Sequence, residues 1–376
     1  MKKRIILIMV SVLLLSMSFS FGDTLKTNLS YDEALTLAIE NSNTLETIDS
    51  RILLAERELK SAVNKSDDVK TSGITSDSVL LENGKIKALY PSQKNRKLMD
   101  LKEERALVAS DLEIEVLEGY NTVKNKKEAL QFRKNDLITA EKEYEQMQVK
   151  YDLGMIIKNE LFKYEIAVNS IESEINTLER DYRKAVIDMN RLIGYPISTT
   201  LDLQGKVELS IESINYDLET IVEKAKENSK TVRDAYNDYL LKDLERVVIN
   251  RYSRYEKPDS YDDLEEEVID LEEAYEDSKI DAAIEVYTDY YNLLNLEADV
   301  DIAALNLELA DKSLEIQKVM FDNEMSVYLD YKKAVDEYRD AYKDHNDKKL
   351  ALFKAKHQFD YTVEKLDDTF KSVIIN

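Results

Sequence analysis

The 376-residue chain carries 52 Lys and Arg against 76 Asp and Glu, a formal net charge of −24. This balance argues against a nucleic-acid partner, because a phosphate backbone is bound by clustered basic residues. With 34% charged and 43% hydrophobic residues but only 7 Gly and 3 Pro, the chain lacks the turns that several compact domains need, and its composition is typical of long amphipathic helices.

Residues 1–22 predict a signal peptide. Basic residues at positions 2–4 precede an apolar stretch over 5–21, and small residues near positions 18–22 fit a cleavage site. An uncleaved anchor is the alternative, but about 17 residues lie at the bottom of the range that spans a bilayer. We therefore expect export. The absence of Cys excludes disulfides and a lipid-modified cysteine.

A first repeat is predicted over residues 23–196. Its first helix, over 31–64, begins after Ser30, which is followed by Glu33 at the spacing of a capping box. The next segment contains an Asn-Gly pair, and residues 78–90 can be read as a short β-hairpin that turns at this pair.

A second helix is predicted over residues 93–151, with a reversal at Gly154. Apolar residues then recur at steps of three and four as far as Leu192, after which Gly194 and Pro196 end the helix. The members of this heptad seam are Leu161, Tyr164, Val168, Ile171, Ile175, Leu178, Tyr182, Ala185, Met189 and Leu192. A seam of this length predicts a coiled coil with the incoming helix, and hence a long antiparallel hairpin.

The same design recurs after a linker over residues 197–213. A second repeat over 214–376 is predicted to contain helices over 216–251 and 262–321 and a last helix that ends near residue 370. A shift of 170 residues aligns the two hairpins, and a shift of 187 aligns the two openings. The predicted fold class is therefore all-α, with two tandem repeats of long coiled-coil hairpins.

Several motifs in this order carry a resemblance to a known family. The chain reads DEALTLAIENS at its opening, YDLG at the first tip and AVIDMNRLIG at the end of the returning helix. Together with the twofold repeat and the signal peptide, these motifs resemble the TolC-like outer-membrane efflux proteins over nearly the whole mature chain. The resemblance implies a homotrimer that forms a hollow α-helical barrel, whose tips dock an inner-membrane pump through a membrane-fusion adaptor.

The resemblance thus predicts an export duct that passes solutes or polypeptides across the cell envelope. It implies a location in the outer membrane or periplasm, or at the extracellular face if the cell has no outer membrane. The alternative is a non-transporting coiled-coil structural or adaptor protein of the envelope.

The chain departs from the family where the first and second helices connect. Family members place a pair of membrane strands in each such connection, and a spanning strand needs about 9 to 11 residues. The connection at Pro258 is too short for two strands, and each strand within 78–90 would hold only about five or six residues. The β-barrel strands are therefore expected to be reduced or absent. This departure favours the structural alternative, whereas retention of both tips favours the duct.

The tips are the candidate functional positions. At the first tip Gly154 is expected in the left-handed backbone conformation. The second tip has Asp322, Asn323 and Glu324 instead, of which Asn323 best tolerates that conformation.

Two acidic residues near the tips are candidates for the tunnel entrance. The resemblance implies this role for Asp330, and for Glu160 as its counterpart in the first repeat. The alternative is that each is an ordinary solvated acid in a chain with 76 Asp and Glu.

The two histidines were considered as functional groups. His345 and Lys348 occupy seam positions that Ile175 and Leu178 hold in the first repeat. His345 could be a pH-sensitive contact, or a polar residue that sets register in a looser seam. His357 lies 12 residues further on, off the spacing of helical metal sites, so no metal site is expected. With no Cys, no phosphate loop and no motif that pairs Ser with His, we predict neither a cofactor nor catalytic residues, and interpret the chain as a non-enzyme.

Overall fold

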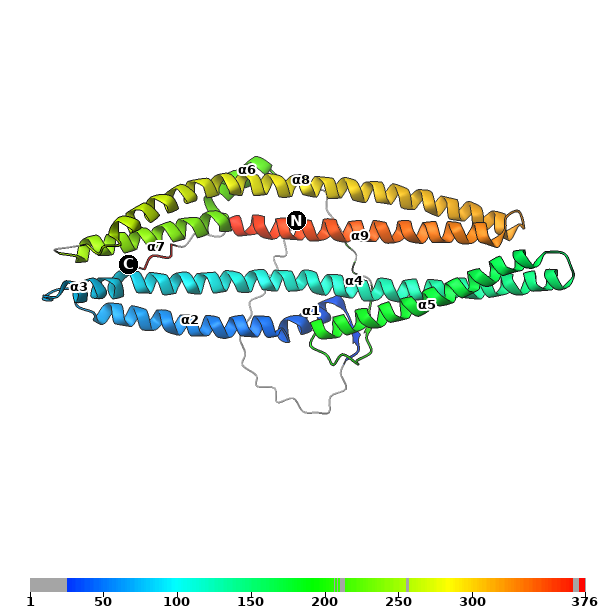
Figure 1. The fold of residues 1–376 in the computed structure, drawn as a ribbon, viewed down its shortest axis with the longest axis horizontal. Coiled ribbons are helices and arrows are strands. Elements are labelled where there is room, and N and C mark those ends of the chain that lie inside the picture. The colour runs from blue at the N-terminus through cyan, green and yellow to red at the C-terminus, as the bar shows by residue number, and fades with distance from the viewer. Residues whose placement is uncertain are drawn as a thin grey trace, which may run out of the picture.

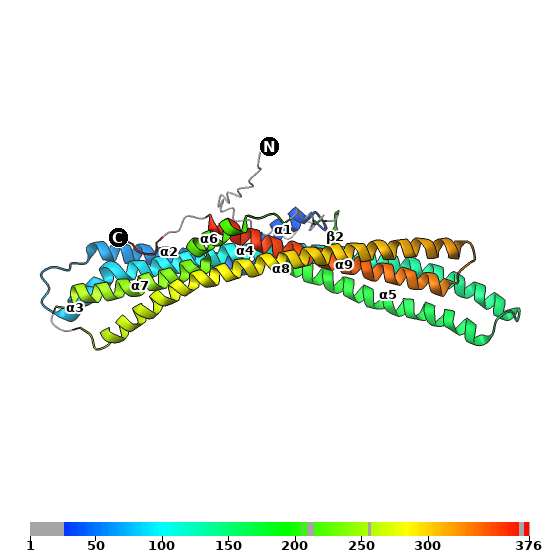
Figure 2. The same ribbon diagram turned by 90° about the horizontal axis from the view of Figure 1, so that it is seen from above.

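The computed structural model describes residues 26–205, 207, 209, 214–254, 257–367 and 372–375. The predicted signal peptide over residues 1–22 lies outside these ranges. Two layers of long helices, one per repeat, lie side by side in a gently curved rod (Figures 1 and 2).

The first repeat contains the following elements: β1 (Asn28–Leu29), α1 (Tyr31–Glu40), α2 (Asn43–Asp68), α3 (Asp77–Gly84), a π-helical turn (Lys85–Leu89), α4 (Tyr90–Asp152) and α5 (Lys158–Leu192). After β2 (Asp202–Leu203), the second repeat contains α6 (Leu218–Asn228), α7 (Lys230–Tyr252), α8 (Tyr261–Asp322) and α9 (Tyr328–Leu366). The ends of α4 and α8 lie 170 residues apart, as do the starts of α5 and α9, so the alignment of the hairpins made from the sequence holds in the structure. The all-α fold with tandem hairpins is confirmed.

The opening of each repeat is two helices rather than the single helix predicted over 31–64 and 216–251. A serine caps the second helix in both cases: Ser42 Oγ accepts from Leu45 N at 3.3 Å, and Ser229 Oγ accepts from Val232 N at 3.2 Å. A serine whose side chain binds the backbone favours an extended conformation at its own position, and this ends the preceding helix. The capping box predicted at Ser30 is present.

The predicted β-hairpin over residues 78–90 is wrong, because the segment is helical. Gly84 has φ −61°, an ordinary helical value. A Cβ at this position would lie 2.2 Å from the ring of Tyr252. The glycine therefore allows α3 to pack closely on α7, and the Asn-Gly pair is not a turn. Asn83 instead donates from Nδ2 to the carbonyl of Lys70 at 2.8 Å.

The segment predicted as a linker contains β2, which pairs in parallel with β1 through Asn28 with Asp202 and Leu29 with Leu203. The fully buried Tyr120 on α4 donates from its hydroxyl to the carbonyl of Leu29 at 3.1 Å and also contacts the carbonyl of Gln204. The short ladder thus fastens the start of the chain to the middle of α4.

Each repeat has its own apolar core. The core of the first joins α1, α4 and α5 around Val116, Tyr120 and Met189, and the core of the second joins α6, α8 and α9 around Leu293, Leu352 and Phe359. Among the helices that the structure describes, none has both the length and the mean hydropathy needed to cross a membrane.

Candidate functional site at the hairpin tips and the junction behind them

The first tip is a tight reversal built on Gly154. This residue has φ +70°, the left-handed conformation that its place in the sequence predicted. Its amide donates to the carbonyl of Tyr151, and the amide of Met155 donates to that of Lys150, both at 2.8 Å. These bonds satisfy the last carbonyls of α4. No atom lies within 4 Å of a Cβ placed on Gly154, so backbone conformation alone calls for glycine there.

The second tip repeats the same hydrogen bonds without glycine. Glu324 donates to Phe321 at 2.9 Å, and Met325 donates to Met320 at 2.8 Å. The prediction that Asn323 takes the left-handed conformation is wrong: Asn323 has φ −98°, and Glu324 has φ +59°. The bonding pattern places the left-handed residue second after the helix, whatever its type. Asn323 instead donates from Nδ2 to the carbonyl of Val319 at 2.7 Å.

Both tips present apolar side chains to solvent. The exposed residues are Leu153, Met155, Ile157, Met325 and Val327. In Figures 1 and 2 the first tip projects beyond the second. Exposed apolar groups at a projecting end are suited to contact with another protein.

Behind the tips, aromatic side chains join the two hairpins. Tyr164 on α5 and Tyr328 on α9 are both buried, and their rings stack with centroids 6.5 Å apart. Burial raises the pKa of the Tyr328 hydroxyl, and the charge of Asp136 adds to the effect. The stack forms part of a core that belongs to both repeats.

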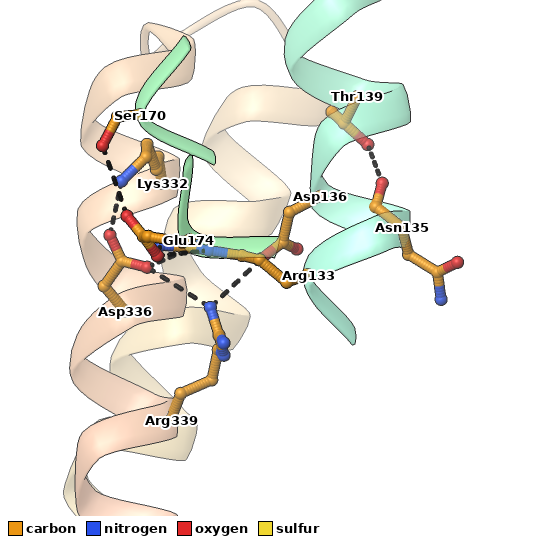
Figure 3. Close-up of polar contacts among 9 residues, drawn as sticks. All are labelled: Arg133, Asn135, Asp136, Thr139, Ser170, Glu174, Lys332, Asp336 and Arg339. Atoms are coloured by element: carbon orange, nitrogen blue, oxygen red, sulfur yellow. Dashed lines mark hydrogen bonds and ion pairs between the residues drawn. The ribbon is translucent and has the colours of Figure 1, made fainter. Parts of the chain in front are cut away.

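Next to this core lies a charged cluster centred on Arg133 of α4, whose side chain is only 4% exposed (Figure 3). Its Nε donates to Glu174 of α5 at 2.7 Å, and its Nη1 donates to Asp336 of α9 at 2.9 Å and to Asp136 at 3.2 Å. Arg339 of α9 also reaches Asp136, at 3.3 Å. Because one buried cation is shared by carboxylates from three helices, its loss would leave those carboxylates without their charge partner.

The two aspartates of this cluster differ in their electrostatics. Burial raises the pKa of Asp136 even though Arg133 and Arg339 oppose the shift. At Asp336 burial acts in the same direction, but the hydrogen bond from Lys332 and the charge of Arg133 outweigh it, so the pKa lies below its ordinary value.

The remaining contacts between the repeats are also polar. Ser110 Oγ lies 3.2 Å from His357 Nε2, which connects α4 to α9. Four ion pairs cross the same junction: Lys85–Glu245 at 3.3 Å, Arg96–Asp234 at 2.9 Å, Arg233–Glu103 at 2.7 Å and Lys354–Glu118 at 2.5 Å. We refer to these contacts and the Arg133 cluster together as the charged junction.

No family model matches the sequence, and no curated protein matches it. Solved structures do. The outer-membrane channel CmeC of Campylobacter jejuni matches with a TM-score of 0.64 and 11% identity, over 91% of this chain and 87% of that one. The outer membrane protein VceC of Vibrio cholerae matches with a TM-score of 0.60 and 10% identity, over 91% and 97%. The open state of the MtrE channel of Neisseria gonorrhoeae also has a TM-score of 0.60, with 12% identity over 89% and 88%. The chain has the TolC-like fold.

Within this TolC-like fold, the two acids predicted for the tunnel entrance occupy equivalent places. Glu160 and Asp330 are each the third residue of a returning helix, where a negative charge interacts favourably with the helix dipole. Glu160 forms an ion pair with Lys163 at 3.0 Å, and Asp330 is exposed. Helix capping thus accounts for both acids locally, and their role at an entrance stays a prediction.

The charged junction was missed by sequence reasoning. Arg133 lies within a stretch that reads as a solvated helix face, and its partners lie 41 and 203 residues away. The TolC-like alignment offers one signal: the position equivalent to Arg133 in α8 is Ala303, which is buried. Among the residues that the structure describes, no group of His, Cys, Asp or Glu is arranged to hold a metal ion.

Proposed function

We propose that the protein is a component of an export duct: several copies form an extracytoplasmic helical barrel in the cell envelope, which passes solutes or polypeptides delivered by a pump. The fold that it shares with outer-membrane channels over about nine-tenths of its length supports this proposal. The observation that carries it is an unpartnered apolar face on α8.

This α8 face extends along most of the helix. Its large side chains are between 40% and 67% exposed and recur at steps of three, four, seven or eleven residues, so they share one side. The members are Ile269, Ile280, Ile284, Tyr287, Tyr291, Ile302, Leu305, Leu309, Ile316 and Val319. A continuous apolar face of this extent indicates a binding surface for another protein.

The repeat itself indicates which partner covers the α8 face. Within one chain, Ser110 of α4 meets His357 of α9. The residues 170 positions away, Ile280 of α8 and Ile187 of α5, are 60% and 42% exposed. Equivalent packing would bring α5 of a second copy against α8 of the first. Such a head-to-tail contact generates a ring if the rotation closes, and the resemblance to TolC-like proteins suggests three copies.

The exposed tip residues are the proposed contact for a membrane-fusion adaptor and, through it, an inner-membrane pump. Apolar groups at both tips lie at the end of the rod, where a partner can reach them without disturbing the barrel wall. The same arrangement places the tunnel entrance near Asp330 and Glu160.

Cysteine cross-linking tests the assembly directly, because the natural chain has no Cys. The double variant Ile187→Cys/Ile280→Cys should form disulfides between chains, and the ladder should end at the trimer. Ser110→Cys/His357→Cys should link within one chain and is the matched control. A monomer in both cases, confirmed by light scattering at tens of micromolar, would refute the ring.

Transport needs a separate measurement. Asp330→Ala should leave the stability nearly unchanged, since an exposed acid contributes little, but should alter the cation preference of currents across planar bilayers. Gly154→Val should abolish export while the rods remain folded. A cross-linked ring in which neither variant differs from the natural protein in current or export would favour the non-transporting structural protein.

A further inference from the structure

A hollow of about 380 Å³ lies between α8 and α9, on the second hairpin only among the described residues. It is lined by Ala304, Leu307, Glu308, Asp311, Tyr338 and His345. None of these residues belongs to the tips or to the charged junction.

Comparison of the repeats explains why the hollow exists. In the first hairpin Lys134 reaches across the seam to Glu179 at 2.9 Å, and Ile175 fills the space beside it with only 9% of its surface exposed. The equivalent positions in the second hairpin are Ala304 and His345. The small side chain of Ala304 crosses nothing, and the imidazole does not replace the packing of Ile175, so the seam remains open.

The walls combine an apolar surface with negative charge. Tyr338 stacks on Tyr342 with ring centroids 6.3 Å apart, and Leu307 adds an aliphatic surface. Burial raises the pKa of the Tyr338 hydroxyl, and the charge of Asp311 contributes to the shift, so Asp311 acts on the tyrosine that lines the hollow. In the part of the chain that the structure describes, Asp311 makes no hydrogen bond or ion pair.

The charges around the hollow leave it net negative at neutral pH. Glu308 is shared with Lys312, which lies 2.5 Å away on the solvent side. Burial lowers the pKa of His345, and Lys349 lowers it further against the opposing charge of Asp344. The imidazole is therefore neutral at pH 7, and it does not offset the charge of Asp311.

We propose that this hollow binds an organic cation with an aromatic or aliphatic body, its ammonium group beside Asp311 and its body against Tyr338 and Leu307. Aromatic faces and carboxylates together recognise alkylammonium groups. The volume lies in the range of small-molecule sites, about 300 to 1,000 Å³. The proposal does not depend on transport, because the hollow is complete within one chain.

Calorimetric titration of the purified mature chain with benzyltrimethylammonium tests the site. We expect saturable binding that Asp311→Asn weakens about tenfold, the loss of one charged contact. Ala304→Leu keeps every charge but fills the space, and should abolish binding while the helical circular dichroism persists. Glu141→Gln, at the equivalent of Asp311 in the first repeat, should bind as the natural chain does.

Two outcomes would overturn the proposal: equal binding of the neutral benzyl alcohol, or unchanged affinity in both Asp311→Asn and Ala304→Leu. The pH dependence gives a further readout. Protonation of His345 adds a positive charge to the hollow, so affinity should fall between pH 7 and about pH 5.5. His345→Asn should remove that dependence, and an affinity that does not change with pH in the natural chain would contradict the placement of the cation beside His345.

Discussion

The inner side of α4 and the corresponding side of α8 solve different problems with one design. On α4 the side that meets the other repeat carries Ser110, Glu118 and the buried Arg133, and its partners are polar or charged. On α8 the aligned side is a nearly continuous row of exposed Ile, Leu and Tyr. Contacts within one chain are held at high effective concentration, so a junction can use ion pairs that set register at little net gain. Contacts between chains must offset the entropy of association, and apolar burial does so.

The largest effect is expected at the centre of the charged junction. Arg133→Ala would leave Glu174, Asp336 and Asp136 without their shared cation, which should lower the free energy of unfolding by about 3 kcal/mol, the lower end for a buried pair because Glu174 is partly exposed. Urea unfolding followed by circular dichroism measures this loss. Lys312→Ala, at an exposed pair on α8, is the control and should change stability by less than about 0.5 kcal/mol. Equal effects of the two variants would mean that the junction contributes no more than a surface pair.

The opposite behaviour is expected on the α8 face. Ile302→Asp places a charge at a position that is 59% exposed in one chain. The variant should retain its unfolding midpoint when monomeric but should raise the dissociation constant of the assembly at least tenfold, about 1.4 kcal/mol. Analytical ultracentrifugation measures the association. Lys318→Asp on the same helix is a charge control, and an equal loss of association in that variant would show that repulsion alone is responsible.

The tips extend the comparison between repeats to the backbone. Gly154→Ala should cost about 1 kcal/mol because the residue has φ +70°, and Glu324→Gly should stabilise the second tip by up to about 1 kcal/mol because that position has φ +59°. Thermal melts of both variants measure the difference. Shifts of the same sign would show that the two reversals do not share their backbone requirement.

The smallest effect concerns pH and separates the two aspartates of the Arg133 cluster. Since the folded pKa of Asp336 is lowered, its charge stabilises the fold above the unfolded pKa of about 3.9, and this contribution is lost as the pH falls through the folded pKa. The pKa of Asp136 is raised, so its ionisation opposes folding, and that cost disappears as the pH falls.

Urea titrations at pH 7 and about pH 3 should therefore give opposite trends for the two asparagine variants. The destabilisation by Asp336→Asn should be greater at pH 7, whereas that by Asp136→Asn should be greater at pH 3, each by less than about 1 kcal/mol. Parallel trends would contradict the assigned shifts.

Sequence reasoning succeeded where the signal was periodic and local. The seam from Leu161 to Leu192, the capping box at Ser30 and the left-handed Gly154 all follow from spacing or from one residue's conformational range. It failed where a local preference competed with packing. The Asn-Gly pair at 83–84 favours a turn by itself, yet the contact between Gly84 and Tyr252 holds it in a helix. Asn323 tolerates φ > 0 better than Glu324 does, but the hydrogen bonds of the tip select the position.

The amino-acid sequence by itself determined the helices, their reversals and the tandem alignment, because these depend on periodicity and on residues within a few turns of each other. Only the tertiary structure decided which helix faces meet. The pairing of β1 with β2, the shared burial of Arg133 and the hollow at His345 each join residues that are more than thirty positions apart in the chain. No short-range pattern encodes such contacts, since a charged residue on a helix has the same local preferences whether its face meets water or another helix. The apolar row on α8 lies between these cases: the sequence contains its period, and the folded chain shows that it is left uncovered.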